Sequence, residues 1–291
     1  MSSEIDTAFR VVDERTASRR IAAWVDAGYA ADLRALGLFD PGRLAELFDV
    51  ANGPRGRAPT TVLELPGRGE HLHLRLALHG GWLRPLLRDA WPGLGRQHAE
   101  LETTRTLRRD GAPVPRPLVA LGERRRSGVW RVCVGTLHVA NAPNAATWLA
   151  DRDADAAAER IARAASAAGE AVRRFHDAGG SHRDLHLGNL LVQEDAAGNA
   201  PRVLVIDLDR ASAGAPPDAG RRMAELMRLF RSAVKRGIAD RLAATGIEAF
   251  TQAYTRGEPA LQRALERTLP RETARLNLHR LGYSLASRLA S

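Results

Sequence analysis

The sequence predicts an α+β protein of two lobes, a small β-rich lobe followed by a larger α-rich lobe. Between residues 60 and 134, short apolar runs alternate with polar residues at the two-residue period of strands. Beyond Asn141, apolar residues recur at the spacing of helices, beginning with an alanine-rich stretch at about 153–178. Because the change falls near residues 136–142, we expect the two lobes to be joined there.

A helical extension is predicted ahead of the two lobes. Its apolar residues are spaced mostly by threes and fours, with charged residues between them: Val11, Val12, Ile21, Trp24, Val25, Leu33, Leu36 and Leu38. Residues 52–59 have the Gly- and Pro-rich composition of a linker. The predicted organisation is a helical extension at 1–58, an N-lobe at 59–140 and a C-lobe at 141–291.

The N-lobe is predicted to open with a hairpin. A strand at 60–65 and an alternating strand at 71–78 flank a turn that contains Gly67 and Gly69. Two short apolar segments on either side of a turn are typical of paired antiparallel strands.

Helices and strands then follow in order. A helix that ends at Asp110-Gly111 is predicted from four residues at helical spacing: Glu100, Leu101, Thr104 and Leu107. Two strands are expected at 117–121 and 129–134. In the C-lobe, the alanine-rich helix precedes two short apolar runs, near 190 and at 203–206, and the remainder is predicted to be helical.

Composition limits the class of protein. The chain has 43 Lys and Arg against 34 Asp and Glu, a net charge of +9, and Lys235 is its only lysine. This balance favours anionic partners such as phosphates or acidic lipid surfaces. Cys133 is the single cysteine, which excludes an intrachain disulfide and favours a reducing compartment.

No targeting or membrane-spanning signal is found. The N-terminus carries Glu4, Asp6 and Asp13 where a signal peptide needs a basic start and an apolar run. No apolar stretch reaches the roughly 20 residues that span a bilayer. We therefore expect a cytoplasmic protein, soluble or peripheral. Nucleic acid is not expected as a partner, since no recognition module occurs and aromatic residues are only 5%.

The stretch from Ser181 to Val192 carries the chemistry. Asp184 follows His-Arg, Asn189 comes five residues later, and an apolar strand follows at once. Asp207 stands eighteen residues beyond Asn189, after the buried-strand pattern at 203–206. Together these residues resemble the catalytic loop and metal-binding aspartate of protein-kinase-like enzymes.

The resemblance implies a role for each residue. In phosphoryl transfer a carboxylate near the acceptor hydroxyl orients and deprotonates it, and we assign that role to Asp184. Asn189 and Asp207 would bind Mg²⁺ shared with ATP, because hard oxygen ligands suit that ion. His182 is expected to support the loop backbone rather than to react.

ATP with magnesium is expected to bind between the two lobes, and the N-lobe is expected to supply the residues that hold its phosphates. Kinases use a cation on the third strand, paired with a helix carboxylate, to bind the phosphates. With no lysine there, Arg75 is the candidate, and Glu100 is its expected partner, with Glu102 second. Gly67 and Gly69 are candidates for a phosphate-covering loop, although a plain hairpin turn also needs glycine. By position alone, the backbone of residues 136–139 would face adenine.

Residues upstream of the motif point to a narrower group. The run of residues 74–82, then Glu100, and Gly-Ala-Pro-Val-Pro-Arg-Pro at 111–117 resemble the lipopolysaccharide core kinase family, the Kdo and heptose kinases. Some members have Arg where other kinases have Lys, which matches Arg75. The resemblance covers about residues 60–235 and implies phosphorylation of a Kdo or heptose hydroxyl on a lipid A-linked acceptor. That reaction takes place at the cytoplasmic face of the bacterial inner membrane.

A basic cluster follows the metal-binding strand: Arg221, Arg222, Arg228, Arg231, Lys235, Arg236 and Arg241. These residues could meet phosphates of lipid A or acidic headgroups. A solvated helix face with Glu225 and Asp240 interspersed explains the pattern equally well.

Two further hypotheses stay open at this point. Residues 185–189, which follow the acid in the loop, also resemble the corresponding residues of soluble small-molecule kinases of the aminoglycoside and choline type. A pseudokinase that binds a partner without catalysis is supported only by Arg75 in place of lysine. Asp184, Asn189 and Asp207 oppose that last hypothesis.

Overall fold

A computed structural model describes residues 9–15, 20–48, 58–79, 89–150, 157–194 and 200–268 of the chain. The chain divides into two units. Unit 1 contains Met1–Arg109 and Pro115–Ala140, and unit 2 contains Asp110–Val114 and Asn141–Ser291. Among the described residues, no helix is both long and apolar enough to cross a membrane.

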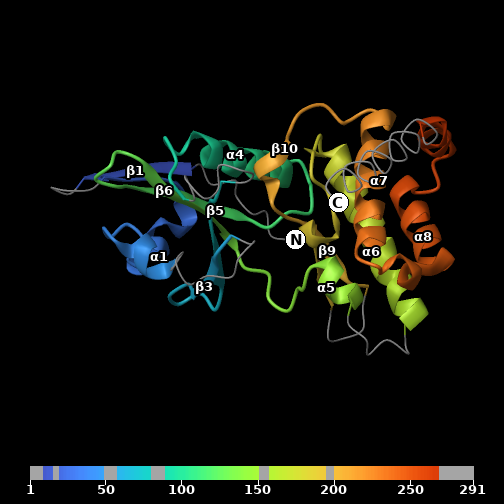
Figure 1. The fold of residues 1–291 in the computed structure, drawn as a ribbon, viewed down its shortest axis with the longest axis horizontal. Coiled ribbons are helices and arrows are strands. Elements are labelled where there is room, and N and C mark those ends of the chain that lie inside the picture. Colours follow the sequence, from blue (N-terminus) through green and yellow to red (C-terminus); the bar gives the residue numbers. More distant parts are fainter. Residues whose placement is uncertain are drawn as a thin grey trace, which may run out of the picture. The chain divides into compact units, whose positions relative to one another are not determined.

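Unit 1 is built on an antiparallel sheet of six strands, in the order β1-β2-β5-β6-β4-β3 (Figure 1). The strands are β1 (Phe9–Arg15), β2 (Arg20–Asp26), β3 (Thr60–Glu64), β4 (His71–Leu76), β5 (Pro117–Arg124) and β6 (Trp130–Leu137). The two predicted hairpins are confirmed, because β3 pairs with β4 and β5 pairs with β6. The Cys133 side chain is fully buried on β6, and burial raises the pKa of its thiol to about 12.

The helical prediction for residues 1–58 is wrong for the part that forms strands β1 and β2. β2 pairs with β5, so this segment extends the sheet of unit 1. Ile21, Ala23 and Val25 are buried on one face of β2, while Trp24 stacks on His98 of a helix on the other face. With apolar residues on both faces, the two-residue alternation of a strand is lost from the sequence.

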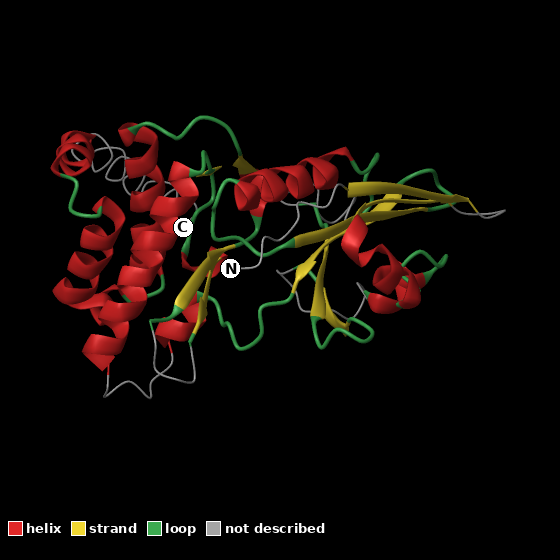
Figure 2. Ribbon diagram, turned by 180° about the vertical axis from the view of Figure 1, so that it is seen from behind, coloured by secondary structure: helices red, strands yellow, loops and turns green. Residues whose placement is uncertain are grey.

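Helices cover both faces of the sheet. The 3₁₀ turn η1 (Ala27–Tyr29) and helices α1 (Ala30–Ala35) and α2 (Arg43–Leu47) supply the helical part of the predicted extension. Their apolar side chains share one core cluster with β2 and β4. Helix α4 (Gly95–Arg109), the helix predicted around Glu100, packs on β5 and β6 (Figure 2).

Unit 2 is mainly helical, as predicted for the C-lobe. Its helices are α5 (Ala145–Ala150), α6 (Ala157–Asp177), α7 (Ala219–Lys235) and α8 (Ala239–Thr255). Its short strands and 3₁₀ turns are β7 (Ser181–His182), η2 (Leu187–Asn189), β8 (Leu190–Gln193), β9 (Arg202–Val205), η3 (Leu208–Arg210) and β10 (Ala211–Ser212). β7 pairs with β10 and β8 with β9, both antiparallel.

Helices α6 and α8 make the main packing contact of unit 2. Gly169 of α6 faces the backbone of α8 so closely that a Cβ there would lie 2.3 Å from the carbonyl oxygen of Phe250. A side chain of any size would push the two helices apart. Parts of the predicted segments lie outside the described residues, among them 52–57 of the linker, 80–82 of the run 74–82, the first residues of the alanine-rich stretch, and the helical tail from 269 to 291.

Candidate active site

The loop with the predicted acid begins at β7 and ends at β8. β7 is held in place by its pairing with β10, which registers His182 opposite Ala211. Just before β7, Gly179 has φ +80°, and a Cβ there would lie 1.8 Å from the carbonyl oxygen of Gly214. Only glycine fits this close approach, which lets the Gly214 N–H donate to the Gly179 carbonyl at 3.1 Å.

Two hydrogen bonds bring the predicted acid and metal ligands of unit 2 together. The Asn189 side-chain amide donates to the backbone carbonyl of Asp184 at 3.0 Å. The N–H of Ile206 donates to the backbone carbonyl of Asn189 at 2.9 Å, which places Asp207 next to the loop. Asn189 is buried, Asp184 is half-buried and Asp207 is exposed.

Asp207 adopts an unusual backbone conformation, with φ 61° and ψ 60°. For residues with a Cβ, the left-handed region costs roughly 1–2 kcal/mol, although Asp tolerates it better than most. Such conformations concentrate at functional sites, where the surrounding structure enforces them. Here the turn directs the chain from β9 into η3 directly after the predicted metal ligand.

His182 supports the loop backbone, as predicted. Its Nδ1 accepts a hydrogen bond from the Asp184 N–H at 3.2 Å, and its Nε2 lies 3.3 Å from the carbonyl oxygen of Ile206. Since Nδ1 is an acceptor, Nε2 carries the proton and donates. Burial lowers the pKa of His182, which keeps the ring neutral and preserves this arrangement.

Glu225 of α7, which one interpretation of the sequence placed on a solvated helix face, is instead buried beneath this loop. It accepts hydrogen bonds from the His182 N–H at 2.9 Å, from Ser181 Oγ at 2.5 Å and from His176 Nε2 at 3.1 Å. Burial by itself raises the pKa of Glu225, but these hydrogen bonds outweigh it and hold the pKa below the usual 4.5. The only sequence signal is one acid within an arginine-rich helix.

In unit 1, the predicted cation and carboxylate form an ion pair. Arg75 Nη2 lies 2.6 Å from Glu100 Oε1, and the Glu100 side chain is only 8% exposed. Glu102, the second candidate, instead contacts Arg105 at 3.4 Å. Glu100 of α4 is therefore the carboxylate that fixes the guanidinium of β4.

The glycine turn between β3 and β4 has an open surface. Gly67 and Gly69 have φ values of +72° and +64°, and no atom lies within 4 Å of a Cβ placed on either. Arg68, between them, donates to the carbonyl of Gly28 at 2.6 Å and to Asp32 at 2.8 Å. The turn is thereby tied to η1 and α1. At the end of β6, the His138 N–H donates to the His71 carbonyl at 2.7 Å.

The predicted basic cluster is not one surface. Arg222 is buried and donates to the Pro217 carbonyl and to Asp177. Arg221 donates to Ser181 at 2.5 Å, and Arg241 donates to the Leu149 carbonyl at 2.5 Å. Of the remaining members, Arg231, Lys235 and Arg236 are exposed.

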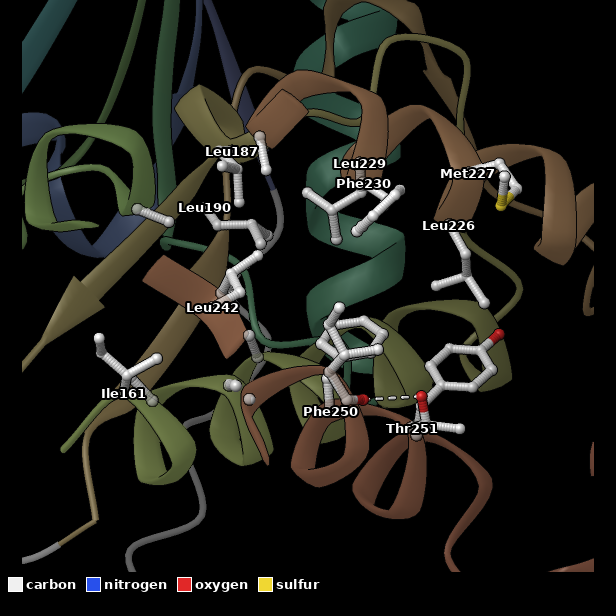
Figure 3. Close-up of a pocket in the computed structure, with 18 of the residues that line it drawn as sticks. Ile161, Leu187, Leu190, Leu226, Met227, Leu229, Phe230, Leu242, Phe250 and Thr251 are labelled. Carbon is white, nitrogen blue, oxygen red and sulfur yellow. Dashed lines mark hydrogen bonds between the residues drawn. The ribbon is translucent and has the colours of Figure 1, made fainter. Parts of the chain in front are cut away.

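Unit 2 also contains an apolar pocket of about 500 Å³. Figure 3 shows Ile161 of α6, Leu190 of β8, Phe230 of α7 and Phe250 of α8 projecting toward the same space. Phe230 is 40% exposed, at the rim. Trp148, Met223 and Leu265 also line the pocket.

The described folds and the 181–189 loop define a protein of the protein-kinase-like class. This agrees with a solved structure titled WaaP in complex with acyl carrier protein, which aligns with a TM-score of 0.51 over 82% of this chain and 95% of that chain, at 20% identity. A model of the lipopolysaccharide kinase (Kdo/WaaP) family matches residues 46–254. The chain belongs to this family, which confirms the resemblance found in the sequence.

Named relatives agree with this membership. The chain is 35% identical over 171 residues to a 3-deoxy-D-manno-octulosonic acid kinase of Xanthomonas euvesicatoria, covering 57% of this chain. It is 35% identical over 168 residues to an enzyme of the same name from Xanthomonas oryzae, covering 56% of this chain. The matches span 62% and 61% of the length of these two relatives.

Proposed function

We propose that this protein is an ATP-dependent kinase that phosphorylates a hydroxyl of Kdo on a lipid A-linked acceptor. The proposal rests on the hydrogen bond from the Asn189 side chain to the Asp184 carbonyl, together with the bond from the Ile206 N–H, next to Asp207, to the Asn189 carbonyl. These bonds bring together the acid and the two oxygen ligands that phosphoryl transfer needs. The Kdo kinase relatives support this acceptor over heptose, and family membership supports it over soluble aminoglycoside or choline substrates.

Asp184 is assigned to the acceptor hydroxyl. The hydroxyl oxygen forms a bond to the γ-phosphorus as the bond to the β–γ bridging oxygen breaks, and ADP leaves with that electron pair. The hydroxyl proton passes to the Asp184 carboxylate. Half-buried on a loop that His182 and Asn189 hold by its backbone, Asp184 is restricted in position while its carboxylate can meet a substrate.

Asn189 and Asp207 suit a magnesium ion. The Asn189 nitrogen is committed to the Asp184 carbonyl, so the side-chain oxygen is oriented away from that bond and is available as a ligand. An amide oxygen and a carboxylate are hard ligands, and Mg²⁺ completes its shell with waters and phosphate oxygens. When bound, the ion would neutralise charge on the β- and γ-phosphates.

Arg75 is assigned to the nucleotide phosphates. A guanidinium held by a buried carboxylate keeps a fixed orientation, and its planar geometry suits phosphate oxygens. Replacement of lysine by arginine is therefore compatible with catalysis and does not favour a pseudokinase. Backbone N–H groups of the turn with Gly67 and Gly69 would cover the phosphates.

The acceptor places the enzyme at the cytoplasmic face of the inner membrane. Exposed Phe230 and Val234 lie on α7 beside exposed Arg231 and Lys235. Apolar and basic side chains on one helix favour an anionic lipid surface. The net charge of +9 acts in the same direction.

Phosphate transfer from labelled ATP with Mg²⁺ tests the proposal. The acceptor panel is Kdo-lipid A, heptosyl-Kdo-lipid A and kanamycin, and wild type is compared with Asp184→Asn. The matched control is Asp240→Asn, an exposed acid on α8. We expect transfer to Kdo-lipid A that is lost in Asp184→Asn and retained in the control. Transfer to kanamycin alone, or equal rates in both variants, would contradict the proposal.

The apolar pocket favours a second binding activity, for an acyl chain. Its apolar lining from α6, α7 and α8 and its volume of about 500 Å³ suit a long hydrocarbon ligand. The solved WaaP complex contains acyl carrier protein. An acyl chain could reach the pocket from such a carrier or from a lipid.

Binding of acylated carrier protein, unacylated carrier protein and lipid A would distinguish these sources. Phe230→Asp at the rim is expected to weaken binding of the acylated ligand at least tenfold. Val62→Asp, similarly exposed on β3 and outside the pocket lining, should leave it unchanged. Equal binding of acylated and unacylated carrier would remove the acyl chain from the explanation.

A further inference from the structure

His186, two residues after Asp184, carries a buried polar atom without a hydrogen-bond partner. Its Nδ1 is enclosed, and no group among the described residues bonds to it. Buried polar groups are nearly always paired, so this exception calls for an explanation. Leu185 is fully buried, whereas Asp184 and His186 on either side of it are both half-buried. The ring is thus partly accessible on the same stretch of loop as the acid.

The burial of Nδ1 decides which nitrogen of the His186 ring carries the proton. A neutral imidazole has one donor nitrogen and one acceptor nitrogen. Burying an N–H without an acceptor is avoided more strictly than burying a lone acceptor, so the proton belongs on Nε2. Nε2 is not enclosed in the way that Nδ1 is, and it presents an N–H donor to a ligand that binds beside Asp184.

Arg236 brings a cation to the same part of the loop. A Cβ placed on Gly188 would lie 3.1 Å from Nδ1 of His186 and 3.8 Å from Nη2 of Arg236, so the two side chains converge on this glycine. Helix α7 fixes the approach, because Ser232 Oγ, one helical turn before Arg236, accepts the Leu187 N–H at 2.9 Å. Arg236 is exposed, so its guanidinium can meet a ligand.

An imidazole donor beside a guanidinium suits an anionic group. Guanidinium groups bind carboxylates through charge-assisted hydrogen bonds, often two at once. The proposed acceptor sugar, 3-deoxy-D-manno-octulosonic acid, carries a carboxylate as well as its hydroxyls, and this group is ionised at neutral pH. A heptose has no carboxylate. A site that binds the carboxylate would therefore select this acceptor over a neutral sugar.

We propose that His186 and Arg236 bind the carboxylate of the acceptor sugar and thereby determine acceptor specificity. The inference rests on the proposed function, in which Asp184 meets a hydroxyl of the same sugar. A carboxylate held near Gly188 anchors the sugar at a second point, which orients that hydroxyl toward Asp184. Neither side chain takes part in bond making, so their loss weakens acceptor binding and leaves ATP binding intact.

Two forms of the acceptor test the role of Arg236. They are Kdo-lipid A and the same molecule with the Kdo carboxyl group converted to its methyl ester. Wild type should prefer the acid over the ester roughly 10- to 100-fold in kcat/KM. Arg236→Met should lose most of this preference through a raised KM for the acid, with the KM of ATP within about twofold of wild type. The matched control, Arg263→Met, removes an exposed arginine elsewhere in unit 2 and should keep the full preference.

Two substitutions test His186 by its chemistry rather than its size. His186→Phe keeps a ring but loses the donor, and it should reduce the preference for the acid about tenfold. Its unfolding temperature should be unchanged or raised, because carbon replaces an unpaired buried nitrogen. His186→Gln can present an N–H near the position of Nε2 and should retain most of the preference. A destabilised His186→Phe protein with the full preference would assign the ring to packing and overturn its role here.

Binding measurements separate this inference from the proposed function. The affinity for each acceptor is measured with a non-hydrolysable ATP analogue, so that no transfer is needed. If wild type transfers no phosphate but binds the acid more tightly, and Arg236→Met abolishes the difference, the proposed function fails and the carboxylate site stands. Transfer to Kdo-lipid A with equal affinity for acid and ester overturns the inference and leaves the proposed function intact. Absence of binding to both acceptors also overturns it.

Discussion

The side-chain nitrogen of Asn189 lies 3.0 Å from the backbone carbonyl oxygen of Asp184, and this bond closes the loop on itself. The two polar atoms of the Asn189 amide therefore have separate functions. Its nitrogen holds the acid's backbone, and its oxygen is left for a cation.

Two substitutions separate these roles. Asn189→Asp keeps an oxygen ligand but loses the donor to Asp184, whereas Asn189→Ala loses both. We expect kcat to fall about 10- to 100-fold in each variant. Only Asn189→Ala should strongly raise the Mg²⁺ concentration for half-maximal rate, measured by Mg²⁺ titration at fixed ATP. An unchanged Mg²⁺ requirement in Asn189→Ala would remove Asn189 from the metal site.

The Arg75–Glu100 ion pair predicts coupled effects on nucleotide binding. Arg75→Met removes charge-assisted hydrogen bonds and should raise the KM of ATP roughly 10- to 100-fold. Glu100→Gln should raise it less, because the guanidinium remains but is no longer fixed. If Glu100 acts only through Arg75, the double variant should resemble Arg75→Met alone. Additive losses would contradict this, and Arg105→Met, beside the partly exposed Glu102, serves as control.

Acid stability should depend on His176. The folded protein holds this ring neutral among Glu225, Tyr254, Arg222 and Asp177, with its pKa below the usual 6.5 because of burial. The unfolded chain binds a proton there below about pH 6.5, so acidification favours unfolding. The stability is thus fully present above that pH and is lost as pH falls toward the folded pKa.

Denaturant unfolding at a series of pH values measures this dependence. Each such histidine adds a slope that approaches about 1.4 kcal/mol per pH unit. His176→Gln should reduce the slope of wild type by up to that amount below pH 6.5. His182 and His73 also have pKa values lowered by burial, so a residual slope should remain. An identical slope in the variant would show that His176 does not titrate on unfolding.

The contact between α6 and α8 predicts opposite effects for two glycines. At Gly169 a Cβ would lie 2.3 Å from the backbone oxygen of Phe250, whereas at Gly246 the nearest atom is 3.4 Å away on Ile161. Gly169→Ala should lower the free energy of unfolding by about 1–3 kcal/mol. Gly246→Ala should be neutral or stabilising by up to about 1 kcal/mol, from helix propensity. Thermal unfolding of both variants checks the pair, and equal destabilisation would refute the contact argument.

The loop of Asp184 and Asn189 could be predicted because its signal is local. Five residues separate the acid from the amide, and a short buried strand follows directly. The hairpin of β3 and β4 was predictable for the same reason, since its pattern and its glycine turn are adjacent in sequence. In each case the interacting groups lie within one or two neighbouring elements.

The sequence predicts helix for the residues of β1 and β2 because the contacts that decide their conformation come from residues far away along the chain. One face of β2 packs into the core that it shares with α1 and α2. On the other face, Trp24 of β2 stacks on His98 of α4. The two-residue alternation of apolar and polar residues identifies a strand that has one buried and one solvent-exposed face. Pairing with β5, about 100 residues later, decides the conformation of this segment.

The sequence by itself determined the order of the two units, the catalytic-loop motif and the family resemblance, because neighbouring residues carry those signals. Only the tertiary structure decided that Glu100 rather than Glu102 holds Arg75, that Arg222 is buried, and that Glu225 lies beneath Ser181. Helix α7 brings Glu225 to a residue 44 positions earlier. A buried charge is stable only where distant donors meet it, and their meeting depends on how the helices pack.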